Sequence, residues 1–114
     1  MAVFNGAFPI LPGKLDDARA FAKETMGSHG ADFDAAQRRA GVTRETWTIE
    51  SAPDGNQFVL VWFEAENPEV AFTQLMDDSE HSVWFRARVQ EVTGVNLAEP
   101  PSGDAPEVVV DWSA

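Results

Sequence analysis

The chain has 114 residues, enough for one domain, and 44% of them are hydrophobic. Its net charge of −11 argues against binding to nucleic acid or to an anionic membrane, because both depend on Lys and Arg against phosphate. Without Cys there is no disulfide, thiolate nucleophile or Cys-ligated metal, as suits a cytoplasmic protein.

The first half of the chain predicts a strand and two helices. Residues 3–10 form an apolar segment that ends at Pro9, Pro12 and Gly13, and we expect a strand there. No basic region precedes it, so we expect no signal peptide. Residues 14–26 carry apolar side chains at helical spacing, and a second helix is expected over residues 32–40, before Gly41.

The second half begins with a predicted hairpin. Residues 43–51 alternate between polar and apolar, residues 53–56 have turn composition, and residues 57–65 are apolar on both faces. Pro68 opens a short helix to about residue 76, and Ser79 caps a longer helix that ends at Gly94. A loop over residues 98–105 and a last strand over residues 107–112 complete the chain.

This order, β-α-β-β-α-β, predicts one α+β domain over residues 1–114 with a ferredoxin-like fold. Right-handed crossovers place the helices on one face of a four-stranded antiparallel sheet. The opposite face has no cover within the chain, so we expect a homodimer through the face that carries Thr46, Thr48, Val59, Val61 and Phe63.

Four segments carry a resemblance to known proteins: GAFPILPGK (6–14), RRAGVTRETW (38–47), WFRARVQEVTGV (84–95) and VVDW (109–112). The chain resembles the dimeric α+β barrel superfamily, which includes cofactor-free monooxygenases, haem-degrading enzymes and muconolactone-isomerase-like proteins. More closely, it resembles an uncharacterised family of short bacterial proteins. The resemblance implies a dimeric barrel and leaves the activity open.

One pair of carboxylates is the main candidate for chemistry. If the hairpin has a two-residue turn at Asp54-Gly55, Glu45 faces Glu64 across the strands, and Trp47 faces Trp62 on the same side of the sheet. A buried pair would share a proton and suit general acid–base catalysis.

Other arrangements of the same carboxylates stay open. The two glutamates could be solvated at the end of the sheet, or bridged by Arg86 or Arg88. A three-residue turn would shift the register by one residue and separate them.

The two histidines give weaker signals. We expect His81 in the first turn of a helix. There it is either a functional residue, as a neutral acid–base group or an axial ligand, or an ordinary surface residue. His29 lies in a Ser-His-Gly loop. They lack metal-ligand spacing, and no phosphate-binding glycine loop is present, so we expect neither a metal nor another cofactor.

We therefore expect a homodimeric small-molecule protein with a pocket between helices and sheet. The candidate ligand-binding side chains are Trp47, Trp62, Trp84, Arg86 and Arg88. The function is either that of a cofactor-independent monooxygenase- or isomerase-like enzyme or that of a non-catalytic module that binds a ligand or a protein.

Overall fold

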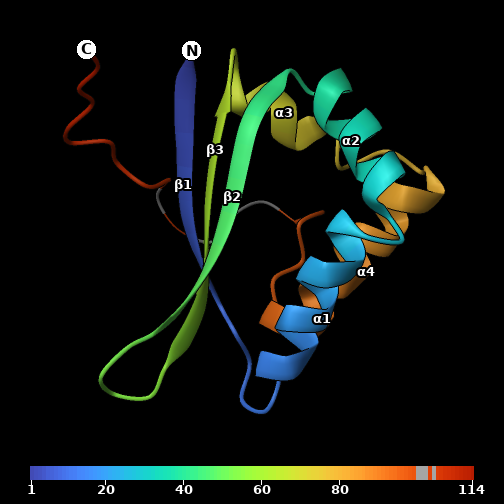
Figure 1. The fold of residues 1–114 in the computed structure, drawn as a ribbon, viewed down its shortest axis with the longest axis vertical. Coiled ribbons are helices and arrows are strands. Elements are labelled where there is room, and N and C mark those ends of the chain that lie inside the picture. Colours follow the sequence, from blue (N-terminus) through green and yellow to red (C-terminus); the bar gives the residue numbers. More distant parts are fainter. Residues whose placement is uncertain (100–102, 104) are drawn as a thin grey trace.

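The computed structural model describes residues 1–99, 103 and 105–114. Within these residues the chain forms a three-stranded antiparallel sheet and four helices. Figure 1 shows two layers, with the helices gathered on one side of the sheet. The expected α+β class is confirmed.

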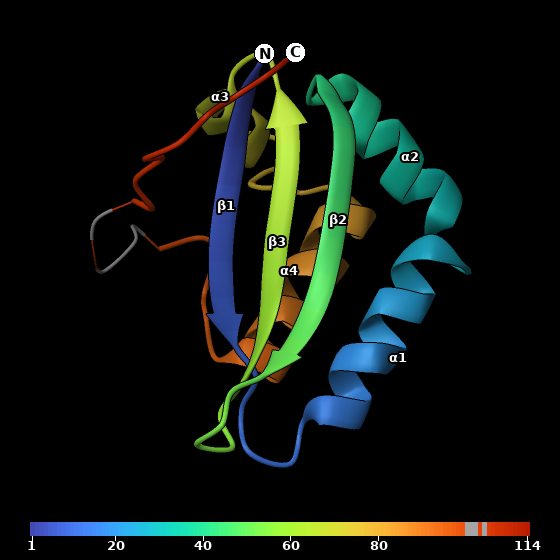
Figure 2. The same cartoon turned by 60° about the vertical axis from the view of Figure 1, so that its left-hand side comes forward.

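The strands are β1 (Ala2–Pro9), β2 (Val42–Ser51) and β3 (Gln57–Ala65), close to the predicted ranges. The sheet order is β1-β3-β2, so β3 is the central strand. Figure 2 looks onto the sheet face that points away from the helices, which we call the open face. The helices cover only one of the two apolar faces of β3 (Figure 2).

The hairpin between β2 and β3 turns over three residues, Pro53-Asp54-Gly55. The N–H of Ala52 donates to the carbonyl of Asn56 at 2.7 Å, and the N–H of Gly55 donates back to Ala52 at 2.9 Å. Gly55 has a φ of 90°, a left-handed conformation that suits glycine at the end of such a turn. This turn is one residue longer than the two-residue turn from which the glutamate pairing was predicted.

The longer turn makes the predicted register wrong by one residue. Glu45 lies opposite Phe63 and Trp47 lies opposite Val61, whereas Glu64 lies opposite Arg44. Because side chains alternate along a strand, the shift moves one member of each predicted pair to the other face. Glu45 therefore faces the helices, and Glu64 lies on the open face.

The same shift corrects the predicted dimer surface. Thr46 and Thr48 lie on the open face, but Val59, Val61 and Phe63 belong to the helix-facing side. The β3 side chains on the open face are instead those at alternate positions, namely Phe58, Leu60, Trp62 and Glu64.

The helices are α1 (Leu15–Met26), α2 (Gly30–Arg39), α3 (Pro68–Thr73) and α4 (Glu80–Thr93). The Ser79 hydroxyl caps α4 by accepting from the N–H of Ser82 at 3.2 Å, as predicted, and Gly94 ends the helix with a φ of 75°. Helix α3 is shorter than predicted. Among the helices in the described part of the chain, none has both the length and the apolar character needed to cross a membrane.

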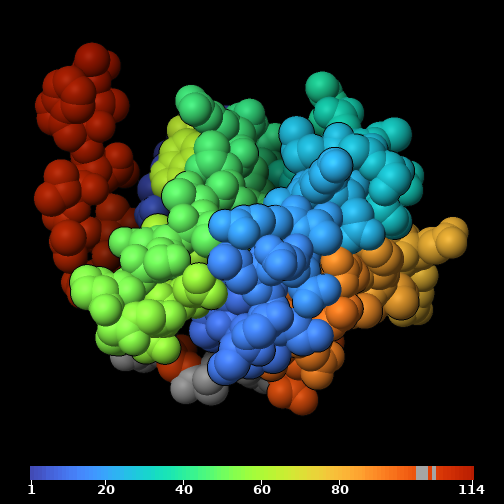
Figure 3. All heavy atoms as spheres, turned by 60° about the horizontal axis from the view of Figure 1, so that its bottom comes forward, coloured from blue at the N-terminus to red at the C-terminus, as the bar shows by residue number. Residues whose placement is uncertain are grey.

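The predicted fourth strand is wrong. Residues 105–114 form no strand, and the side chains of Val109, Val110 and Trp112 are 79%, 81% and 81% exposed. This tail runs on the side of the sheet away from the helices, and its end stands clear of the body in Figure 3. A valine-rich segment has strand propensity, but it forms a strand only when it hydrogen-bonds to a neighbouring strand, and this segment does not. The predicted loop over residues 98–105 falls partly on residues 100–102 and 104, outside the described residues.

The core consists of two clusters between sheet and helices. In the larger one, the Phe21 ring of α1 lies 5.3 Å from the rings of both Trp47 and Phe85. In the smaller one, Phe63 of β3 stacks on Phe4 at 5.0 Å. Aromatic rings from the helices and the sheet therefore meet between the two layers.

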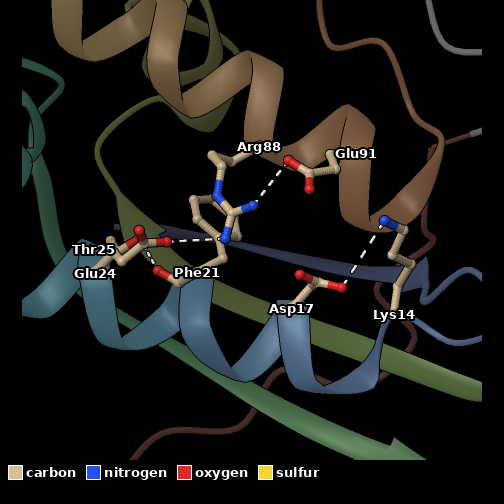
Figure 4. Close-up of polar contacts among 7 residues, drawn as sticks. All are labelled: Lys14, Asp17, Phe21, Glu24, Thr25, Arg88 and Glu91. Atoms are coloured by element: carbon tan, nitrogen blue, oxygen red, sulfur yellow. Dashed lines mark hydrogen bonds and ion pairs between the residues drawn. The ribbon is translucent and has the colours of Figure 1, made fainter.

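Arg88 joins α4 to α1 (Figure 4). Its guanidinium donates to Glu24 of α1 at 2.9 Å and to Glu91 of α4 at 2.8 Å, and lies over the Phe21 ring. Arg86 donates to the backbone carbonyls of Leu75 and Asp77. Arg88 therefore ties two helices together, Arg86 ties α4 to the segment that precedes it, and neither bridges Glu45 or Glu64.

We predict that Arg88→Leu lowers the free energy of unfolding by about 1–2 kcal/mol, because it removes two charge-assisted hydrogen bonds from a side chain that is only 18% exposed. The matched control is Arg38→Leu, which removes an exposed ion pair with Asp34 and should cause no measurable change. Urea titration measures both. Equal losses would show that Arg88 contributes no more than a surface ion pair.

Candidate functional site

A cavity of about 160 Å³ lies between the helices and the sheet. Its walls include residues of both core clusters, so the cavity lies between the larger and the smaller cluster. Three buried alanines, Ala18, Ala36 and Ala71, face this space and leave it unfilled. Most of the wall is apolar, and Glu45 and His81 are the two titratable side chains in its lining.

Glu45 reaches the cavity because the β2 register turns it toward the helices. Its carboxyl group accepts a hydrogen bond from Gln37 Nε2 at 2.9 Å and one from Trp47 Nε1 at 2.6 Å. Burial raises the pKa of Glu45 above its ordinary value of 4.5, and the two hydrogen bonds oppose that rise without cancelling it. The result is an oriented carboxyl group that holds its proton more tightly than a free glutamate.

The position of Glu45 fits acid–base chemistry. A raised pKa brings a carboxyl group closer to neutral pH, where it can both give and accept a proton. The Trp47 and Gln37 donors fix its orientation, and the surrounding apolar wall keeps its electric field strong. The cavity wall contains one glutamate, Glu45, in place of the predicted pair.

His81 also lines the cavity, from the first turn of α4 as predicted. It is buried, at 8% exposure. Burial is the main cause that lowers the pKa of His81 below its ordinary value of 6.5. The negative charges of Asp32 and Asp77 raise this pKa, whereas His29 and Arg39 lower it further. The imidazole is therefore more often neutral at pH 7 than a free histidine would be.

The remaining predicted site residues lie elsewhere. Glu64 accepts a hydrogen bond from Thr43 Oγ1 at 2.9 Å on the open face, and Trp62 lies on that same face. Trp84 stacks on His29, with ring centroids 3.5 Å apart and planes 3° apart. Of the eight sequence-predicted site residues, Glu45, Trp47 and His81 line the cavity.

Two features of the site were missed from the sequence. Gln37 was not singled out, although it follows the buried Ala36 and so lies near the inner side of α2. His29 and Asp32 are one helical turn apart, a spacing that could have marked them as neighbours. Only the fold brings His81 beside them, with the His29 and His81 rings 6.4 Å apart.

Comparison of the chain with known protein families, with curated proteins and with solved structures gave no match. The resemblance to dimeric α+β barrel proteins therefore stays an expectation from the sequence.

We predict that Glu45→Gln does not lower the free energy of unfolding at pH 7. Any increase should be on the order of 1 kcal/mol. Because the folded-state pKa of Glu45 is raised, protonation stabilises the fold, and this contribution declines as pH rises from 4.5 through the folded pKa. Glutamine keeps an acceptor oxygen without the charge. The difference in stability between mutant and wild type should therefore grow with pH in this window, as denaturant titrations at a series of pH values would measure.

The control uses both glutamates. Because Glu45 and Glu64 lie on opposite faces of the sheet, the effects of Glu45→Gln and Glu64→Gln on stability should add in the double mutant. A coupling energy well above zero would contradict the separation and restore the shared-proton pair.

Proposed function

We propose that the protein binds a small, mainly apolar molecule in the cavity, with the polar group of that molecule against the Glu45 carboxyl. The observation that carries the proposal is the placement of this oriented carboxyl group in an otherwise apolar wall. Pockets of this composition, apolar with a few placed polar groups, are typical of small-molecule sites.

The size of the cavity limits the ligand. At about 160 Å³ it is close to the roughly 150 Å³ of an apolar cavity that takes up benzene. It is smaller than the roughly 300 Å³ at which pockets for larger ligands begin. The rings of Phe21, Phe33, Trp47 and Phe85 line it and suit a planar partner. We therefore favour a single-ring molecule with one hydroxyl or carbonyl group.

Among the activities found in the superfamily that the sequence resembles, isomerisation is the one for which the cavity contains a suitable acid–base group, the Glu45 carboxyl. The Glu45 carboxylate would take a proton from a C–H next to a carbonyl, and the resulting carboxyl would return it at another atom of the same molecule. Such a shift changes no oxidation state and needs no further reactant. The raised pKa of Glu45 supports this role.

We predict that phenol binds in the cavity and that Ala36→Leu abolishes the binding, because the larger side chain fills the space. The matched control is Ala35→Leu, at an exposed neighbouring position on α2, which should bind phenol as the wild type does. Glu45→Leu should weaken phenol about tenfold through the lost hydrogen bond and leave benzene unaffected. Chemical shift changes in NMR titrations measure the affinity for each ligand in the wild type and the three variants.

Two results would count against the binding proposal. One is the absence of saturable shifts with either phenol or benzene. The other is phenol binding that Ala36→Leu leaves unchanged, since the molecule would then be bound elsewhere. Saturable binding without turnover of any carbonyl compound would retain the binding role and remove the isomerase role.

We further propose that two copies of the chain associate through their open faces. The middle of this face carries Leu60 and Trp62, flanked by Thr46 and Thr48, so its centre is apolar and uncharged. The exposed tail at residues 108–112 lies on the same side of the sheet (Figure 1). A two-fold pairing would cover both apolar surfaces at once.

We predict that the wild type sediments as a dimer at micromolar concentration and that Trp62→Glu sediments as a folded monomer, because the new charge would be buried in the contact. The control is Val83→Glu, which adds the same charge at a 49% exposed position on α4 and should remain a dimer. A monomeric wild type, or equal behaviour of the two variants, would refute the proposed contact.

A further inference from the structure

Two histidines and a carboxylate come together where the junction of α1 and α2 lies beside the first turn of α4. His29 immediately precedes α2, Asp32 lies in the first turn of α2, and His81 lies in the first turn of α4. One ligand atom from each of these side chains lies within 4.8 Å of the other two. Neither Glu45 nor the Arg88 network belongs to this cluster.

His81 gives an independent reason to expect a ligand here. Its side chain is 8% exposed, and neither ring nitrogen has a hydrogen-bond partner among the described residues. Buried polar groups in proteins are almost always paired, because an unpaired one costs on the order of 1–3 kcal/mol. The cluster with His29 and Asp32 offers the missing partner in the form of a bound ion.

The surroundings hold the histidines in place. His29 is clamped flat against Trp84, and the ring of His81 packs beside Trp84 and Phe85 at centroid distances of 5.9 and 6.0 Å. These contacts limit ring rotation, so less entropy is lost when a ligand binds. Asp32 is exposed and free to turn toward the two rings.

We infer that His29, Asp32 and His81 bind a divalent transition-metal ion. Two imidazoles and one carboxylate suit zinc, iron and their neighbours in the first transition row, and disfavour Mg²⁺ and Ca²⁺, which prefer oxygen ligands. A tetrahedral zinc with bonds of about 2.1 Å holds its ligand atoms about 3.4 Å apart, so atoms that now lie up to 4.8 Å apart must close by up to about 1.4 Å. Rotation of Asp32 and small shifts of the rings provide that movement.

The site would border the cavity, because His81 is part of the cavity wall. Three protein ligands leave at least one coordination position for water or for an oxygen atom of a bound molecule. The metal site rests on the His81 cluster alone, so it does not depend on the proposed role of Glu45.

The test is titration of chelator-treated protein with Zn²⁺ and with Co²⁺. We expect one ion per chain at micromolar or tighter affinity by calorimetry, with Co²⁺ shifting the ring signals of His29 and His81 in NMR spectra. His29→Gln and Asp32→Asn should each weaken Zn²⁺ at least tenfold, and neither replaces a buried core side chain. Mg²⁺ should not compete at equal concentration.

The matched control is Asp34→Asn, which removes the same charge from an exposed position on the same helix and should bind Zn²⁺ as the wild type does. This control separates the site from general attraction of cations to an acidic chain. Absence of Zn²⁺ and Co²⁺ binding, or binding that His29→Gln and Asp32→Asn leave unchanged, would overturn the inference. Failure of phenol to bind would leave it standing.

Discussion

The three-residue turn at Pro53-Asp54-Gly55 is the constraint on which the arrangement of the molecule depends. Its length sets the register of β2 against β3, and the register decides which side chains face the helices. With this turn, Glu45 and Trp47 reach the cavity, and Trp62 faces outward. The half-buried Glu45 carboxyl group, the aromatic wall of the cavity and the proposed dimer contact all follow from the length of this turn.

Local signals in the sequence predicted the parts of this fold that depend on local physics. Ser79, Gly94 and the apolar run in β3 gave a helix start, a helix end and a central strand, because caps and periodicity act over a few residues. The hairpin register was not determined, since turns of two and three residues share the same composition. The valine-rich end of the chain showed strand propensity but no partner, and propensity alone does not pair a strand.

The candidate site was predicted only in part, for a related reason. Glu45, Trp47 and His81 were selected from residue type and periodicity, and they do line one cavity. The neighbours that give them their properties come from distant segments: Gln37 from α2 for Glu45, and His29 for His81. Contacts of that kind are set by how helices pack on the sheet, which residue spacing does not encode.

The cavity also has a mechanical consequence. The part of the roughly 160 Å³ cavity that water does not fill adds to the volume of the folded state and is eliminated on unfolding, so hydrostatic pressure favours the unfolded chain. A molecule held against Glu45 would fill the cavity, and occupancy would then make the protein stiffer as well as more stable under compression.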